Sequence, residues 1–258
     1  MEEKERIEQF RYKVDMMSSL VGRLLLRGFA VHVLGLNNRE VKFVRTDRGK
    51  PVLEVNTSGW DYNVSHAGDW VVLAAASQGS LGVDVMKTKD SRVDRLEEFF
   101  RIMRRQFTDE EWMSISGNQC VSDEDKLATF FRHWTLKESY VKAVGTGLNL
   151  DLRTLNFKID EDLNPNCVIT SSTLQISGRL TPWKFEESVL DEEHVVSVAL
   201  TDNDEIENIP KFSVLRIDQI FNLFSQHSVE QNIEAELLRP VEVNDFTLFN
   251  SKDHPKPF

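Results

Sequence analysis

Residues 134–147 read WTLKESYVKAVGTG, and the fold and the candidate chemistry are best analysed outward from this stretch. Trp134, Glu138 and Lys142 are spaced four residues apart, so they share one face of a helix. Gly145 predicts the end of that helix. A carboxylate one turn before an ammonium offers a metal ligand or base beside a phosphate contact, although exposed helices often carry such pairs as simple surface charges.

A second acidic position lies upstream, where residues 81–85 read LGVDV and predict a strand. Side chains alternate along a strand, so Gly82, Asp84 and Met86 should point to one face. A single carboxylate near a strand end can reach a cation or a ligand. An ordinary surface aspartate would give the same pattern, so the strand by itself does not decide.

A basic turn stands out against the formal net charge of -11. Residues 45–51 read RTDRGKP and place Arg45, Arg48 and Lys50 around a tight turn. Arginine offers a planar fork for phosphate, and lysine offers a mobile point charge. The turn therefore indicates either a phosphate contact or a solvated hairpin tip.

A serine and a histidine end another predicted strand, in the segment NVSHAGDW at residues 63–70. The Ser65 hydroxyl, the His66 imidazole and nearby backbone N–H groups can all donate to phosphate, and Asn63 belongs to the same candidate site. A nucleophilic Ser-His pair is discounted, because adjacent side chains diverge in a strand and no G-x-S-x-G turn is present. A histidine bonded locally in a turn is the other interpretation.

Helices and strands follow an order that occurs twice along the chain. A long amphipathic helix is expected from about Glu2 to Gly28, with Gly28 as its terminator. Thr108 and Glu111 form a capping-box pattern, and Ser122 is suited to cap the next helix. The first set of strands is expected at residues 41–46, 50–55, 62–65, 70–76 and 81–85. Helices are then expected at 93–106, 107–112 and 122–144. A second set of strands follows at 155–159, 173–177, 182–187 and 194–200.

This order predicts an α+β fold made of a pseudo-twofold pair of halves, each with a long helix packed on a small antiparallel sheet. We expect an N-terminal half at residues 1–86, a C-terminal half at 87–203 and a partly ordered extension at 204–258. Residues 212–224 could add a strand and a turn of helix, and the last eight residues should be frayed.

Composition narrows the functional classes. The apolar fraction of 40%, with 16 Phe and 5 Trp, supports a sizeable core. The acidic balance argues against general binding of nucleic acid or anionic membrane. Two cysteines without metal spacing, no signal-peptide pattern and no long apolar run predict a soluble, cytosolic protein.

Taken in order, these segments resemble the 4′-phosphopantetheinyl transferases, specifically the monomeric two-half type. The likeness rests on RTDRGKP, NVSHAGDW, GVDVMK, FTDEEW and FRHWTLKESYVKAVGTGL, and it extends from the first helix to about Leu200. It implies transfer of phosphopantetheine from coenzyme A to a serine of an acyl- or peptidyl-carrier protein, with release of adenosine 3′,5′-bisphosphate. The implied partners are coenzyme A and an apo carrier, such as a domain of fatty-acid synthase or aminoadipate reductase. The resemblance also implies that the protein is a monomer.

The same resemblance assigns roles to individual residues. Asp84 and Glu138 match metal carboxylates, and Lys142 matches a lysine at the pyrophosphate. The remaining matches are to residues that contact coenzyme A, and they are Arg6, Arg45, Arg48, Lys50, Asn63, Ser65 and His66. Of these, Ser65 and His66 match the segment near the adenosine 3′-phosphate. Mg²⁺ usually takes one or two carboxylates plus substrate phosphates and water. Asp84 and Glu138 supply that number of carboxylates.

The chain departs from the family pattern at two places. Many bacterial relatives read D-x-E in the strand, whereas the second acidic position here is Met86, which leaves two carboxylates instead of three. The family also has a strand before the first helix. We therefore expect either that the sequence is truncated or that this half lacks an edge strand.

Two other functions stay open at this point. A non-catalytic module that binds coenzyme A or a carrier protein could keep the fold, although binding alone does not require Asp84, Glu138 and Lys142 together. Another Mg²⁺-dependent nucleotide transferase is the second alternative. Because carrier helices are typically acidic, the RIMRRQF segment at residues 101–107 is a candidate docking patch or an ordinary amphipathic helix.

Overall fold

The computed structural model describes residues 9–46, 51–55, 57, 59–89, 96–117, 122–147, 150–165, 167–201, 212–220 and the backbone of 247–250. The chain divides into two compact units, Met1–Ser77 with Pro210–Phe258, and Gln78–Ile209. This division precedes the boundary expected at residue 86, so the strand of Asp84 belongs to the second unit. The segment expected as a separate extension belongs largely to the first.

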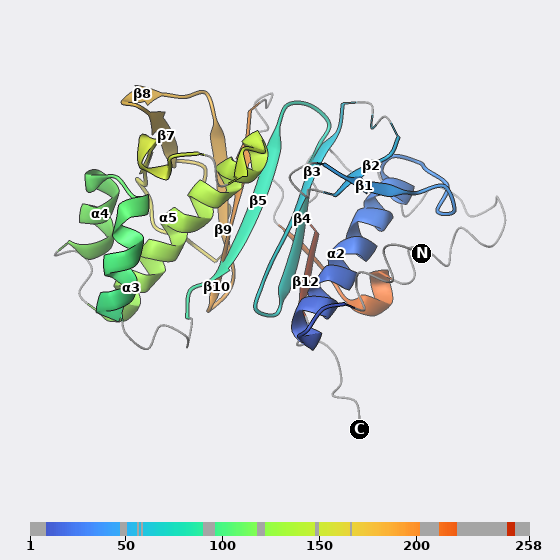
Figure 1. Cartoon of the computed structure of the whole chain (residues 1–258), viewed down its shortest axis with the longest axis horizontal. Helices are drawn as coiled ribbons and strands as arrows, with labels where there is room; N and C mark the ends of the chain where they lie inside the picture. Colours follow the sequence, from blue (N-terminus) through green and yellow to red (C-terminus); the bar gives the residue numbers. More distant parts are fainter. Residues whose placement is uncertain are drawn as a thin grey trace. The chain divides into compact units, whose positions relative to one another are not determined.

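In the first unit a long helix packs on a four-stranded sheet (Figure 1). The strand order is β11-β12-β4-β3, and β11 and β12 are parallel while the other neighbours are antiparallel. The elements of this unit are α2 (Lys13–His32), β1 (Phe43–Arg45), β2 (Pro51–Leu53), β3 (Asp61–Ala67), β4 (Trp70–Ala76), β11 (Ser213–Leu215) and β12 (Thr247–Asn250). Strands β1 and β2 form a separate antiparallel pair.

The first helix differs from its prediction at both ends. Residues 9–12 are not helical, and α2 begins at Lys13. Gly28 does not end the helix, which continues to His32. Phe29, Ala30 and Val31 are buried in the core of this unit, so burial of the last turn outweighs the weak helix propensity of glycine.

In the second unit a long helix again packs on a small sheet. The helix α5 (Asp123–Val144) contacts β5 (Leu81–Lys87) and β10 (His194–Leu200), and β10 lies between β5 and β9 (Lys184–Asp191) with both pairings antiparallel. A second antiparallel sheet consists of β6 (Leu155–Lys158), β7 (Thr173–Ile176) and β8 (Arg179–Leu180). The predicted α+β class, with a long helix on a small sheet in each unit, is confirmed.

Local signals placed several element ends correctly, although the strands predicted at 81–85 and 182–187 continue to Lys87 and Asp191. Capping boxes open both α4 (Asp109–Ser116), at Thr108 with Glu111, and α5, at Ser122. Gly145 ends α5 in the left-handed conformation, with φ of 64°. Strands β4 and β10 coincide with their predicted residues, whereas β8 and β12 were not anticipated. Within the described residues, none of the helices combines the length and apolar character that a membrane span needs.

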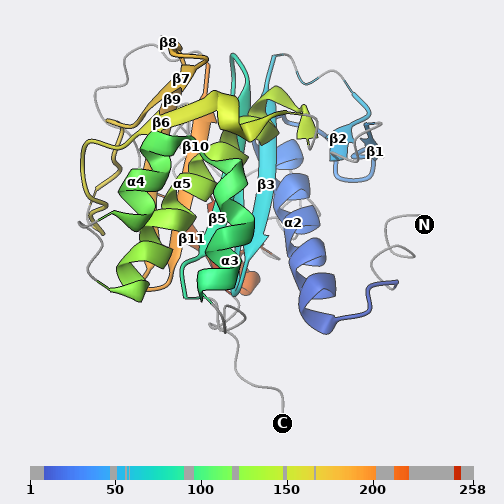
Figure 2. The same cartoon turned by 60° about the vertical axis from the view of Figure 1, so that its left-hand side comes forward.

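Figure 2 shows three helices of the second unit, α3 (Leu96–Met103), α4 and α5, near one another, and an aromatic cluster packs among them. It is built from side chains of α3, the short 3-10 turn η1 (Arg104–Gln106) with Phe107, α4 and α5. The buried members are Phe100, Phe107, Ile115, Phe130 and Phe131. Trp134 is partly buried against this cluster and stacks with Phe130 at 6.2 Å between ring centroids.

The helix α5 approaches the strand β5 closely at Gly82. A Cβ atom added at Gly82 would lie 2.2 Å from the Ser139 carbonyl oxygen and 2.3 Å from the Ala143 nitrogen. Both obstacles are backbone atoms of α5, so a side-chain rotation cannot relieve the clash. Only glycine lets the helix lie this close to the strand.

We expect Gly82→Ala to lower the free energy of unfolding by about 1–3 kcal/mol, because the added methyl group forces the helix away from the strand. Urea denaturation followed by circular dichroism measures this change. A Gly82→Ala protein as stable as the parent would show that the helix and strand are not in contact.

Gly22→Ala is a matched control in α2, where the added Cβ would meet a Val64 side-chain methyl at 3.1 Å. This neighbour is a side-chain carbon that can shift by a few tenths of an ångström. Alanine is also the better helix former by about 1 kcal/mol. We therefore expect the control to change stability much less than Gly82→Ala does.

Candidate functional site

Asp84 is buried on the face of β5 that packs against α5. Its residue is 5% exposed, and its Oδ1 accepts a hydrogen bond from the Lys142 Nζ at 2.6 Å. Gly82 and Met86 lie on the same face, as the strand alternation predicted. The interpretation of Asp84 as an ordinary surface residue is therefore wrong. Asp84 and Lys142 form an ion pair between two segments that are far apart in the sequence.

Glu138 lies one helical turn before Lys142 and is half-buried. Burial raises the pKa of its carboxyl above the ordinary value, the negative charge of Asp84 raises it further, and Lys142 lowers it. The two carboxylates are therefore close enough to repel, and the Lys142 ammonium lies near both of them.

The donor set suits Mg²⁺, which prefers hard oxygen ligands and keeps several of its positions for water and phosphate. Among the described residues, no group of three or more His, Cys, Asp or Glu side chains is placed to hold a metal. Asp84 and Glu138 remain the two predicted carboxylate ligands. Met86 packs against the aromatic cluster. A thioether turned toward aromatic rings cannot replace a third carboxylate.

The predicted contacts to a phosphate-rich ligand lie in the first unit. Asn63 and Ser65 are buried in β3, whereas His66 is exposed. Consecutive residues of a strand face opposite sides, so Ser65 and His66 diverge, which supports setting aside a nucleophilic Ser-His pair. Arg45 is exposed in β1, opposite Pro51. Arg6, Arg48 and Lys50 lie outside the described residues.

Three of the predicted site residues therefore come together in the second unit, namely Asp84, Glu138 and Lys142. The described candidates of the first unit lie on two strands, Arg45 on β1 and Asn63, Ser65 and His66 on β3. The roles assigned to both groups stay predictions.

The residue of α5 that the sequence interpretation overlooked is Lys137, next to Glu138. Its side chain is 0% exposed, and its Nζ lies 2.9 Å from Glu111 Oε2. A signal was present in the periodicity, because positions 130, 133, 137 and 140 follow helical spacing and all four residues are buried. A lysine in such a series indicates a buried partner of opposite charge.

Two family models cover most of the chain. Residues 1–78 match the model described as "4'-phosphopantetheinyl transferase, N-terminal", and residues 80–199 match "4'-phosphopantetheinyl transferase superfamily". The point between the two matches lies close to the division between the structural units, at Ser77 and Gln78.

Several curated proteins are similar along most of the chain. The L-aminoadipate-semialdehyde dehydrogenase-phosphopantetheinyl transferase of Pongo abelii is 40% identical over 206 residues, 77% of this chain and 66% of that protein. The chain thus spans just under two thirds of that relative. The protein of the same name from Xenopus laevis is 37% identical, with 80% of this chain and 70% of the relative covered. The phosphopantetheinyl transferase of Thraustochytrium sp. is also 37% identical, with 77% and 69% covered.

The two family models and these relatives point to one assignment. The chain belongs to the 4′-phosphopantetheinyl transferase superfamily.

Proposed function

We propose that this protein transfers the 4′-phosphopantetheine group from coenzyme A to a serine of an acyl- or peptidyl-carrier protein. The observation that carries the proposal is the contact between Asp84 and Lys142 beside Glu138, in a chain of this superfamily. The transfer joins the serine oxygen to the phosphorus that bears pantetheine. The pyrophosphate bond breaks, and adenosine 3′,5′-bisphosphate leaves.

Each residue of the second unit has a task in this scheme. Glu138, directly or through a water molecule, accepts the serine proton, and Lys142 stabilises or protonates the leaving bisphosphate. Asp84 and Glu138 would hold Mg²⁺, which when bound neutralises charge that develops on the pyrophosphate. Asp84 also fixes the Lys142 ammonium by a short, charge-assisted hydrogen bond.

The raised pKa of Glu138 agrees with a role as proton acceptor. A carboxylate whose pKa lies above the ordinary glutamate range is a stronger base than an exposed glutamate. Because the negative charge of Asp84 contributes to this shift, a bound cation would lower the pKa again and favour the ionised form.

Recognition of coenzyme A is assigned to basic and polar residues of the first unit. Their cationic and hydrogen-bonding groups are suited to its phosphates, including the 3′-phosphate. The proposed contacts are Arg6, Arg45, Arg48, Lys50, Asn63, Ser65 and His66, together with Lys142 of the second unit. Names of the relatives suggest an aminoadipate-pathway carrier among the possible protein substrates.

Mass spectrometry of an apo carrier protein incubated with this protein, coenzyme A and Mg²⁺ tests the proposal. We expect a mass gain that corresponds to one phosphopantetheine. A second sample with ATP in place of coenzyme A should show no gain. Binding of coenzyme A without transfer to any of several apo carriers would instead favour a non-catalytic binding module.

For Glu138→Gln we expect the rate of holo-carrier formation to fall by roughly 10²–10⁴-fold, because the amide neither accepts the proton nor balances the cation. Lys142→Ala should also lower the rate. Near-normal rates for both variants at saturating Mg²⁺ would contradict the assigned roles.

The same Glu138→Gln variant should keep or gain thermal stability without Mg²⁺. A carboxyl whose folded pKa is raised contributes most to stability below its unfolded pKa, and that contribution is lost as pH rises through the folded pKa. At neutral pH the ionised glutamate therefore opposes folding. Added Mg²⁺ should raise the melting temperature of the parent more than that of the variant.

A docking patch for the carrier is proposed on α3 and η1. Arg101, Ile102 and Arg105 are exposed, and Ile102 keeps 47% of its surface in contact with solvent. Arg104 is less available, since it pairs with Asp109 and lies over the Trp112 ring. Two cations around an exposed aliphatic side chain suit an acidic carrier helix with an apolar face.

We expect charge reversal at Arg101 and Arg105 to raise KM for the carrier while KM for coenzyme A stays within about twofold, because surface charges mainly affect partner association. Steady-state kinetics with each substrate varied in turn measures this. Lys158→Glu in β6, an exposed cation outside the patch, is the control. Equal effects of the patch reversal and of Lys158→Glu on KM for the carrier would contradict the proposed docking patch.

A further inference from the structure

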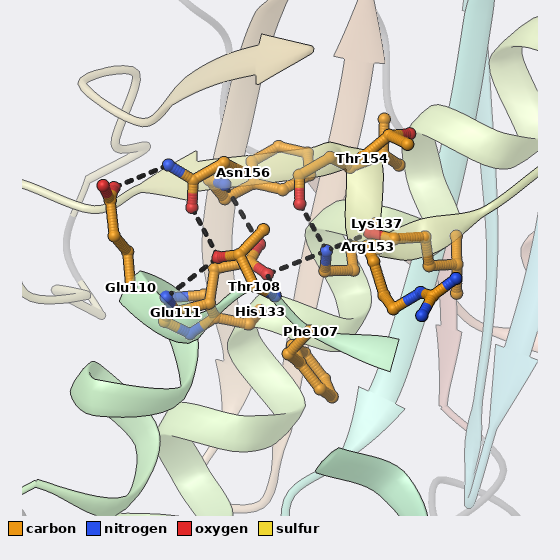
Figure 3. Close-up of polar contacts among 12 residues, drawn as sticks. Phe107, Thr108, Glu110, Glu111, His133, Lys137, Arg153, Thr154 and Asn156 are labelled. Carbon is orange, nitrogen blue, oxygen red and sulfur yellow. Dashed lines mark hydrogen bonds and ion pairs between the residues drawn. The ribbon is translucent and has the colours of Figure 1, made fainter. Parts of the chain in front are cut away.

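The Lys137 side chain is 0% exposed, and Figure 3 shows its ammonium bonded to neighbouring groups. It pairs with Glu111 Oε2 at 2.9 Å and donates to the carbonyl oxygens of Leu152 at 2.8 Å and Leu155 at 2.6 Å. These three acceptors use the three protons of a lysine ammonium. The Nζ also lies 5.3 Å from the centroid of the Phe107 ring.

Glu111 is equally well bonded. One of its oxygens accepts from the Thr108 backbone N–H at 2.9 Å and pairs with Lys137, and the other accepts from the Phe157 backbone N–H at 3.0 Å. The glutamate that closes the α4 capping box therefore also joins α4 to β6. Figure 3 shows Glu111 and Lys137 pointing toward each other from α4 and α5.

Lys137 thus links the middle of α5 to three other elements. They are the first turn of α4, the 3-10 turn η3 (Leu152–Thr154) and the start of β6. A second set of contacts holds α5 two residues later, where the Ser139 carbonyl approaches Gly82 of β5. Glu138 lies between these two contacts in the sequence. Because successive helical residues are rotated by about 100° around the axis, Glu138 faces a different direction from either neighbour.

A buried charge loses its hydration, so it is tolerated only when its partners are correctly placed. Rotation or sliding of α5 would separate Lys137 from Glu111 and from both carbonyl groups together. The same movement would shift Glu138 and Lys142 relative to Asp84. Lys137 itself cannot touch a substrate, because its side chain is 0% exposed.

We propose that Lys137 is a positioning residue, whose bonds to Glu111, Leu152 and Leu155 hold α5 in the rotation that directs Glu138 and Lys142 toward Asp84. This inference rests on the proposed phosphopantetheine transfer. It adds to that proposal a buried ion pair that governs the rate of the reaction without contacting the reactants.

Lys137→Met removes the ammonium and keeps a chain of similar length. In holo-carrier assays, run well below the melting temperature where circular dichroism shows a folded protein, we expect kcat to fall by roughly 10–100-fold. KM for coenzyme A should stay within about twofold. Glu111→Gln, which keeps an acceptor oxygen for the capping box, should lower kcat in the same direction and serves if Lys137→Met does not fold.

Ile115→Ala provides a control for lost stability. Ile115 is fully buried in the aromatic cluster and lies on α4, four residues after Glu111. Its truncation should lower the melting temperature without changing kcat of the folded protein, because it breaks no bond to Lys137. A similar fall in kcat for Ile115→Ala would mean that destabilisation alone slows the reaction, and would overturn the proposal.

The double variant Lys137→Met with Glu111→Gln separates positioning from stability. Because no unbalanced buried charge remains, its melting temperature should recover relative to Lys137→Met alone. Its kcat should stay low, since the bonds that orient α5 are still absent. Recovery of kcat in parallel with the melting temperature would overturn the proposal. Absence of transfer by the parent protein would instead refute the proposed function.

Discussion

The contact between α5 and Gly82 is the constraint on which the second unit depends. Backbone atoms of Ser139 and Ala143 occupy the space where any other residue would place its Cβ. The missing side chain lets the helix lie directly on β5, so that Asp84 reaches Lys142 at 2.6 Å. A longer separation would leave a buried carboxylate without this cation, and burial of an uncompensated charge is strongly unfavourable.

A buried ion pair constrains the same helix from another direction. Lys137 and Glu111 are both fully enclosed, and each has backbone partners besides the other. Such a pair adds little net stability compared with an apolar pair, but it penalises every arrangement that separates its members. Close packing at Gly82 restricts the distance between helix and strand, and the ion pair restricts the rotation of the helix.

The candidate site brings two carboxylates near each other and near a lysine. Arg132 and Glu187 form a bidentate pair elsewhere in the unit, whereas Asp84 and Glu138 both lie near Lys142. Burial and the charge of Asp84 raise the pKa of Glu138. The proposed Mg²⁺ would relieve the repulsion between the two carboxylates.

Local chemistry in the sequence was sufficient for the helix caps at Thr108 and Ser122, the stop at Gly145, and the alternation that sets Gly82 and Asp84 on one face. Each depends on neighbouring residues and on fixed helical or strand periods. Tertiary structure decided three other features. They are the pairing of Lys142 with a partner 58 residues away, the burial of Lys137 and the extension of α2 past Gly28. They depend on which faces pack together, and that energy comes from segments far apart in the chain.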